Sequence, residues 1–263
     1  MKVKIIHHRE TVYEFLKDKS RYDYLYQFYD LEERNWENVI CYGLFADEEL
    51  KQIAIVAINY GIPVLLASCY EDSTYNIELL TRIKSFLPRE FYTHIDKETL
   101  KSVFNEEEIK DYQEYMNMGH EEASHEELKG KSLKIGYDQI RDIKDLLSNS
   151  YPEAWLDDEL VKLNRNFGIY RSGKLVSFAG IHAYSEEHQI AAIAHVTTHP
   201  DYRRRGYGEV VVNSLIKDLK GDIKYIGLNV KTDNVSAISC YKKLGFKEYG
   251  RFIGCEIEMF KKI

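Results

Sequence analysis

The chain has 263 residues, of which 44% are hydrophobic and 30% are charged, so it has enough apolar side chains for packed cores and too little uniform charge for disorder. Because domains commonly contain roughly 100 to 200 residues, we expect two of them. The formal net charge of −7 argues against a general electrostatic grip on nucleic acid or on anionic lipid, since both need a basic surface. We therefore expect neither nucleic acid nor a membrane as a partner.

The cysteines and the N-terminal sequence predict a cytoplasmic protein with reduced thiols. No metal-ligand spacing relates the four cysteines, which are Cys41, Cys69, Cys240 and Cys255. The first ten residues are too polar for a signal peptide. The most apolar region, residues 53–69, is interrupted by Asn59, Gly61 and Pro63, which favours two strands joined by a turn over a spanning helix.

The first half, residues 1–120, is predicted to contain three consecutive strands and then alternating helices and strands. The strands are expected at 39–45, 52–59 and 62–70, followed by a helix at 77–86, a strand at 90–95, a helix at 97–104 and a strand at 111–118. Residues 121–131 are acidic and lack an apolar stripe, so they are interpreted as a linker, with His120 and His125 as solvated residues instead of metal ligands.

The second half, residues 132–263, repeats this order of elements. A strand at 132–136 is followed by helices at 137–147 and 157–164, and then by strands at 167–171, 175–184 and 189–198. A helix at 206–220, a strand at 224–230, a helix at 234–244 and two closing strands within 246–260 complete the pattern. The fold class predicted for each half is α+β, a mixed central sheet flanked by helices, and the repeated order suggests an internal duplication.

The strongest local signal is the stretch from His195 to Gly208, in which an apolar strand ends, a loop turns through a proline and two glycines open a helix. Backbone N–H groups at a helix start, with roughly half a unit of positive dipole charge, attract phosphate. Gly206 and Gly208 would let a diphosphate approach the main chain closely. Positive charge is added by three neighbouring residues, Arg203, Arg204 and Arg205. Cations are unfavourable at this end of a helix unless an anion lies between, so the pattern favours phosphate binding.

The pattern Arg203-x-x-Gly206-x-Gly208 after an apolar strand resembles the acyl-CoA pyrophosphate loop of the GNAT acetyltransferase superfamily. A second stretch is similar to that superfamily's later signature and comprises Leu228-Asn229-Val230, Asn234, Ala237 and Tyr241-Lys242-Lys243-Leu244-Gly245-Phe246. The resemblance implies a GNAT-like fold for 132–263, and the tandem layout resembles glycine N-acyltransferase-like proteins.

The resemblance also implies roles for individual residues. Main-chain groups of Val196 and Thr197, where the strand is expected to bulge, would pair with the pantetheine arm of an acyl-CoA. Amides from Arg203 to Gly208, including that of Tyr207, would hold the pyrophosphate. Asn234 would contact the cofactor with Ala237 on the same helical face, and Tyr241 would protonate the departing thiolate.

The general base is left open by the sequence, because the strand before the phosphate loop has no acidic residue at 190–194. His195 is the nearest titratable candidate, although alternation places it beside Ile193 and Thr197 and a structural role is equally consistent. His182, Glu186, Glu187 or a chain of water molecules are the alternatives. The spacing of His195 and His199 lies across a strand end and not on a helix, so no metal site is expected.

These patterns predict an enzyme that uses acetyl-CoA or another acyl-CoA to acylate a primary amine of a small molecule, with no metal, as a monomer or homodimer. The alternative is a non-catalytic module that senses acyl-CoA. In the first half, the matching stretch from Ser68 to Asn76 has acids and no glycine pair or arginine, so this half is predicted not to hold CoA. It would then shape the acceptor cleft or contact the second half.

Overall fold

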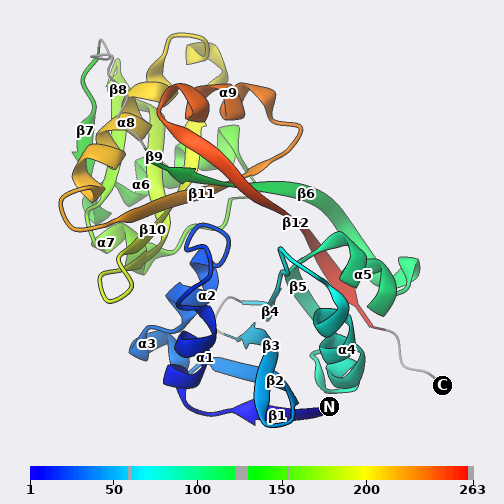
Figure 1. The fold of residues 1–263 in the computed structure, drawn as a ribbon. Helices are drawn as coiled ribbons and strands as arrows, with labels where there is room; N and C mark the ends of the chain where they lie inside the picture. Colours follow the sequence, from blue (N-terminus) through cyan, green and yellow to red (C-terminus); the bar gives the residue numbers. More distant parts are fainter. Residues whose placement is uncertain (59–60, 122–129, 153, 260–263) are drawn as a thin grey trace. The chain divides into compact units, whose positions relative to one another are not determined.

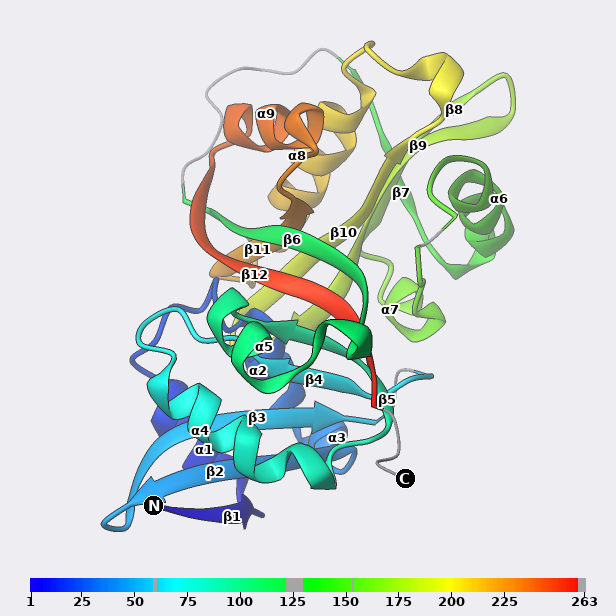
Figure 2. The same cartoon turned by 90° about the vertical axis from the view of Figure 1, so that its right-hand side faces the viewer.

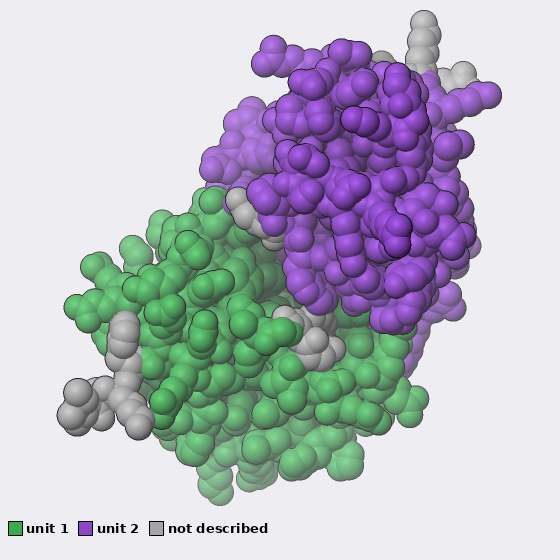
Figure 3. Space-filling view, turned by 180° about the vertical axis from the view of Figure 1, so that it is seen from behind, with its two compact units in different colours: residues 1–117, 249–263 green, residues 118–248 purple. Residues whose placement is uncertain are grey.

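The computed structural model describes residues 1–58, 61–121, 130–152 and 154–259 (Figure 1). The chain divides into two compact units, which are residues 1–117 with 249–263 and residues 118–248 (Figure 3). Most of the linker expected at 121–131 lies outside the described residues, and the domain boundaries stay a prediction. Among the described helices, none is both long and apolar enough to cross a membrane.

Unit 1 has an α+β fold in which helices cover both faces of a sheet. Its elements are β1 (Lys2–Ile6), α1 (Arg9–Leu16), α2 (Leu25–Asp30), α3 (Glu33–Trp36), β2 (Val39–Ala46), β3 (Glu49–Ala57), β4 (Val64–Ala67), α4 (Thr74–Ile83), β5 (Glu90–Ile95), α5 (Lys97–Val103) and β6 (Ile109–His120), whose last residues belong to unit 2. Strands β1 to β4 pair antiparallel in chain order, and β4 pairs parallel with β5. Helices α4 and α5 cover one face of the sheet and α1 the other (Figure 1).

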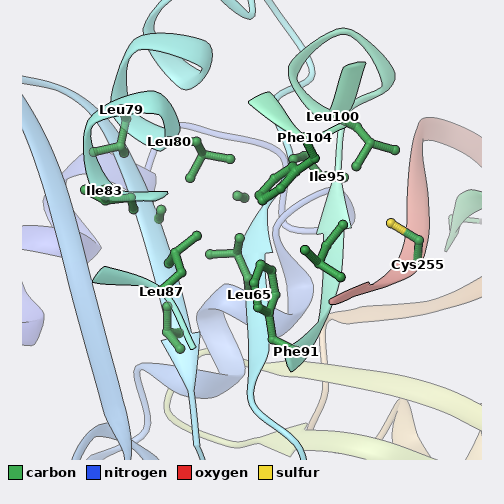
Figure 4. Packing of buried hydrophobic residues seen from close by; sticks show 14 of the residues in the cluster. Leu65, Leu79, Leu80, Ile83, Leu87, Phe91, Ile95, Leu100, Phe104 and Cys255 are labelled. Carbon is green, nitrogen blue, oxygen red and sulfur yellow. The ribbon is translucent and has the colours of Figure 1, made fainter. Parts of the chain in front are cut away.

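The core of unit 1 lies between α4, α5 and the sheet. Helix α4 directs Leu79, Leu80 and Ile83 towards buried strand residues such as Leu65 and Phe91 (Figure 4). Each of these side chains is at most 1% exposed. Leucines and isoleucines three and four positions apart form the apolar face that lets this helix pack on the sheet.

Unit 2 has the same succession of elements. They are β7 (Leu133–Ile135), α6 (Ile140–Ser150), α7 (Asp158–Lys162), β8 (Asn166–Arg171), β9 (Lys174–Ser185), β10 (Ile190–Thr198), α8 (Tyr207–Leu219), β11 (Tyr225–Lys231), α9 (Val235–Lys243) and β12 (Phe246–Glu258), whose residues from Tyr249 on belong to unit 1. Strands β7 to β10 pair antiparallel in chain order, and β10 pairs parallel with β11. Helices α6 and α7 lie on one face and α8 on the other (Figure 2). The predicted α+β fold and the repeated order of elements are confirmed.

Three parts of the sequence-based prediction need correction. His120, expected to be solvated, is buried at the end of β6, with its ring 5.2 Å from that of Phe246. The two closing strands are one long strand, β12, whose last part pairs with β5. Glycine keeps this strand continuous at Gly250, where a Cβ atom would lie 2.5 Å from Asp23 and Tyr70. Residues 1–38, for which no element was predicted, form β1 and three short helices. Each of these segments is at most eight residues long, too short for a clear periodic pattern.

Candidate acyl-CoA site

Near its end, strand β10 leaves its neighbour β11 and bulges against its other neighbour, β9. Its parallel pairing with β11 covers only Ile190 to Ala192, although β10 continues to Thr198. On the other side, the register with β9 shifts between Ala194 and Thr197, so that the strand bulges at His195 and Val196. A bulge leaves main-chain groups outside the ladder and redirects side chains. The bulge expected around Val196 and Thr197 is therefore present.

The bulge also overturns the alternation that was assumed for His195. This residue has φ of 55°, a left-handed conformation that ends the regular alternation of side chains with Ile193 and Thr197. Its side chain is nevertheless buried, with 8% exposed. Such a conformation costs of order 1–3 kcal/mol in a residue other than glycine and is found preferentially at functional sites.

The start of helix α8 has backbone N–H groups without a capping side chain. The residue before the helix, Gly206, has φ of 75° and makes no side-chain capping hydrogen bond. Arg204 also has positive φ, 61°, so the sign of φ alternates along 204–206. Alternation of this kind turns successive N–H groups towards one side and forms a concavity for anions. A Cβ atom added at Gly206 would meet nothing within 4 Å, and at Gly208 only Thr198 at 3.9 Å.

The three arginines of this loop are exposed, but they are not equivalent. The Nε of Arg203 donates to the carbonyl of Thr198 at 3.1 Å, and Nη2 of Arg205 donates to the carbonyl of Asp201 at 3.0 Å. Both guanidinium groups thus brace the loop, which leaves Arg204 as the arginine best placed to meet a ligand.

A fourth arginine, Arg171 at the end of β8, was missed by the sequence reasoning. Its guanidinium lies 4.9 Å from the ring of Tyr207, the first residue of α8, and its Nε donates to the Tyr207 hydroxyl at 3.1 Å. No local pattern could have indicated this contact, because the two residues are 36 positions apart. It adds a cation beside the start of the helix.

Helix α9 carries Tyr241, the predicted acid, and begins at the predicted cap residue, Asn234. Asn234 caps the helix by accepting from the backbone N–H of Ala237 at 3.1 Å. Tyr241 is 7% exposed, and its ring lies 5.8 Å from that of Phe246. Burial raises the pKa of Tyr241, with smaller contributions from Cys240 and Tyr151, so the phenol keeps its proton at neutral pH.

The other candidate bases fall into two groups. His182 lies on β9 with its ring 5.9 Å from that of His195, and the ring of Trp155 lies 5.7 Å from His182. Glu186 and Glu187 are exposed in the turn that joins β9 to β10, about 16 Å along the strand from His195. The structure thus brings the two histidines together and separates the glutamates from them.

Comparison with known proteins assigns the segment that contains these features. Residues 140–246 match the model of the acetyltransferase (GNAT) family. This segment belongs to the GNAT family. Among curated relatives, the GNAT segment is similar to the [ribosomal protein bS18]-alanine N-acetyltransferase of Escherichia coli, with 33% identity over 84 residues that make up 32% of this chain and 55% of that protein. It is also similar to the N-alpha-acetyltransferase RimI of Mycobacterium tuberculosis, with 29% identity over 38% of this chain and 63% of that protein. The chain thus spans a little over half the length of these curated relatives.

Solved structures share the fold of both units. A putative GNAT acetyltransferase from Novosphingobium aromaticivorans has a TM-score of 0.62 at 15% identity, covering 89% of this chain and 96% of that one. A tandem GNAT protein from the clavulanic acid biosynthesis pathway has a TM-score of 0.60 at 10% identity, covering 100% of both chains. The chain therefore has the arrangement of a tandem GNAT fold.

Proposed function

We propose that unit 2 binds acetyl-CoA or another acyl-CoA and transfers the acyl group to a primary amine. The observation that carries this proposal is the uncapped start of α8, where φ is positive at Arg204 and Gly206 and arginines surround the free N–H groups. Within a GNAT segment, these features suit a diphosphate: the amides supply hydrogen bonds, the helix dipole supplies positive potential and Arg204 supplies charge.

The rest of the acyl-CoA would follow the open edge of β10. Beyond Ala192 the strand has no ladder partner on β11, so we expect main-chain groups on this edge, those of Val196 first, to pair with the amides of a pantetheine arm. The carbonyl of Thr197 already accepts from the hydroxyl of Ser177 at 3.2 Å, so Thr197 would offer the arm less. Extended ligands often bind by adding to such an exposed strand edge. Asn234 and Ala237, at the start of α9, would then border the cofactor.

The reaction proposed is direct attack of the amine on the thioester. The amine nitrogen bonds to the carbonyl carbon, the C–S bond breaks with its electrons on sulfur, and the sulfur takes a proton from Tyr241 to leave as CoA thiol. Tyr241 suits this role because burial raises the pKa of its phenol and keeps it protonated. His195 would take the proton that the amine loses.

The acceptor proposed is a small molecule with a primary amine. The net charge of −7 favours the approach of a cationic amine, although charge bears more on encounter than on identity. The relative named for acetylation of alanine in a ribosomal protein makes an amino-terminal α-amine the natural comparison in an acceptor panel.

The test is calorimetric titration with acetyl-CoA, followed by a thiol-release assay with polyamines, amino acids and a peptide that begins with alanine. We expect one acetyl-CoA per chain and release of thiol that depends on at least one amine. Absence of any affinity for CoA species would overturn the proposal, and binding without amine-dependent thiol release would make unit 2 a sensor instead of an enzyme.

A further inference from the structure

Two neighbouring strands of unit 2 each depart from regular pairing at a histidine. In β9, Ile181 and Ala183 pair with successive residues of β10, so His182 is the extra residue of a bulge. In β10, His195 is one of two residues inserted between Ala194 and Thr197. The two rings are 5.9 Å apart with an angle of 81° between their planes.

His195, the histidine of β10, is buried, and one nitrogen of its ring makes no hydrogen bond to the described residues. Nε2 of His195 is inaccessible to solvent and has no hydrogen-bond partner among the described residues. Leaving a buried polar atom without a partner is unfavourable, and the left-handed backbone of His195 adds strain. Two costs at one residue indicate a group kept for chemistry and not for packing.

The segment between α6 and α7 contributes two groups to the surroundings of the pair. Trp155, in the segment between α6 and α7, stands with its ring edge-on to His182 at 5.7 Å. Asp157, which caps α7, is the charged group that acts on His182, and His182 is the one that acts on His195. Burial lowers the pKa of both histidines, that of His195 to about 3 with a further contribution from His182, so both imidazoles are neutral at neutral pH.

We propose that His182 is a positioning residue for His195, and that the two imidazoles work as a pair that accepts a single proton from the acceptor amine. The inference rests on the proposed acyl transfer. As the amine nitrogen bonds to the thioester carbon, its N–H bond breaks and the proton binds Nε2 of His195. His182 orients that ring and, being partly exposed and under the electrostatic influence of the Asp157 carboxylate, takes the proton on towards solvent.

The pair can hold only one proton at a time, because two imidazolium rings at this spacing repel each other. Protonation of either ring therefore discourages protonation of the other. The pair returns to the neutral state between turnovers, since burial disfavours a lasting charge at His195.

The test is a double-mutant cycle with His182→Phe and His195→Gln. Phenylalanine keeps a ring against Trp155 but has no nitrogen. We expect kcat to fall about 10-fold in His182→Phe and about 100-fold in His195→Gln, with KM for the acyl-CoA within about twofold. The double variant is expected to be no slower than His195→Gln alone, because His182 acts only through His195. His188→Gln, which removes another buried histidine at the β9–β10 turn, is the matched control and should match the wild type.

A second measurement does not depend on turnover. In protein with ¹⁵N-labelled histidine, the imidazole signals report the titration of each ring, and His182→Phe should move the midpoint of His195 to higher pH. Rate losses that add in the double variant, or a His195 titration that does not move, would overturn the inference even if the wild type is active. A wild type that binds CoA but acylates no amine would instead overturn the proposed function, and the titration would still report whether the two rings are coupled.

Discussion

Each unit begins a helix directly after its fourth strand, and the two helix starts differ in what satisfies their backbone N–H groups. In unit 1, Asp72 accepts from the N–H of Thr74 at 2.9 Å and from its hydroxyl at 2.6 Å, while Ser73 donates to Asp96 at 2.8 Å. In unit 2, no side chain caps Gly206. The N-cap residues Ser73 and Gly206 both lack a side-chain capping hydrogen bond, so the difference between the two helix starts lies in Asp72, whose carboxylate holds the first N–H of α4.

The helix after the fifth strand extends this contrast. Asp96 caps α5 by accepting from the N–H of Thr99, as Asn234 caps α9 by accepting from that of Ala237. Seven residues after each cap stand Val103 in unit 1 and Tyr241 in unit 2. The comparison teaches that the fold supplies the same two positions twice, and that side-chain chemistry decides which unit can bind and transfer an acyl group.

The largest effect is expected from placing a carboxylate in the first turn of α8. Gly208→Asp should weaken acetyl-CoA binding by about 300-fold, because a negative charge at the helix start repels the diphosphate. Calorimetric titration measures the affinity. Gly208→Asn introduces a side chain of about the same size without the charge, so its affinity for acetyl-CoA should fall far less. Equal losses of affinity in both variants would show that the size of the side chain, and not its charge, weakens binding.

Next in size is the loss of the phenol. Tyr241→Phe should lower kcat by about 100-fold and leave acetyl-CoA affinity within about twofold, because the hydroxyl acts only on the departing sulfur. Steady-state thiol release gives the rate, and titration gives the affinity. An unchanged kcat would show that Tyr241 packs in unit 2 as Val103 does in unit 1.

A smaller effect is expected from replacing Arg204, the arginine that is not used to hold the loop in place. Arg204→Gln should weaken acetyl-CoA binding about 5-fold, and the loss should shrink at high salt because the group is exposed. Arg141→Gln, on exposed surface of helix α6, is the control. If both variants bind alike, the loop relies on its amides alone.

The smallest effect on binding is expected in unit 1. Asp72→Asn should leave the stoichiometry at one acetyl-CoA per chain and lower the melting temperature by a few degrees through a weakened cap. Hydrogen bonds from Thr74 lower the pKa of Asp72, so this stabilisation is present above the carboxyl's unfolded pKa and is lost as the pH falls through its lowered value. A second CoA site in the variant would show that this carboxylate alone keeps unit 1 closed.

Much of the fold could be predicted from short-range patterns. The glycine pair and arginines marked the start of α8, and apolar periodicity marked α4 and α6 to within a few residues, because these signals depend only on neighbours in the chain. The single long strand β12 and the elements of 1–38 could not be predicted in this way. At Gly250, a Cβ atom would lie 2.5 Å from Asp23 and Tyr70, which are far away in sequence, so the need for glycine there is visible only in the folded chain.

The same distinction between local and long-range features holds for the candidate site. The amino-acid sequence by itself determined the loop that opens α8, the cap at Asn234 and the position of Tyr241 on its helix, since each follows from residues within one turn or one loop. Only the tertiary structure decided that β10 leaves β11 after Ala192, that Arg171 reaches Tyr207 and that His182 faces His195. Strand register and the contacts between elements depend on how the whole sheet packs, and no local stretch of sequence encodes them.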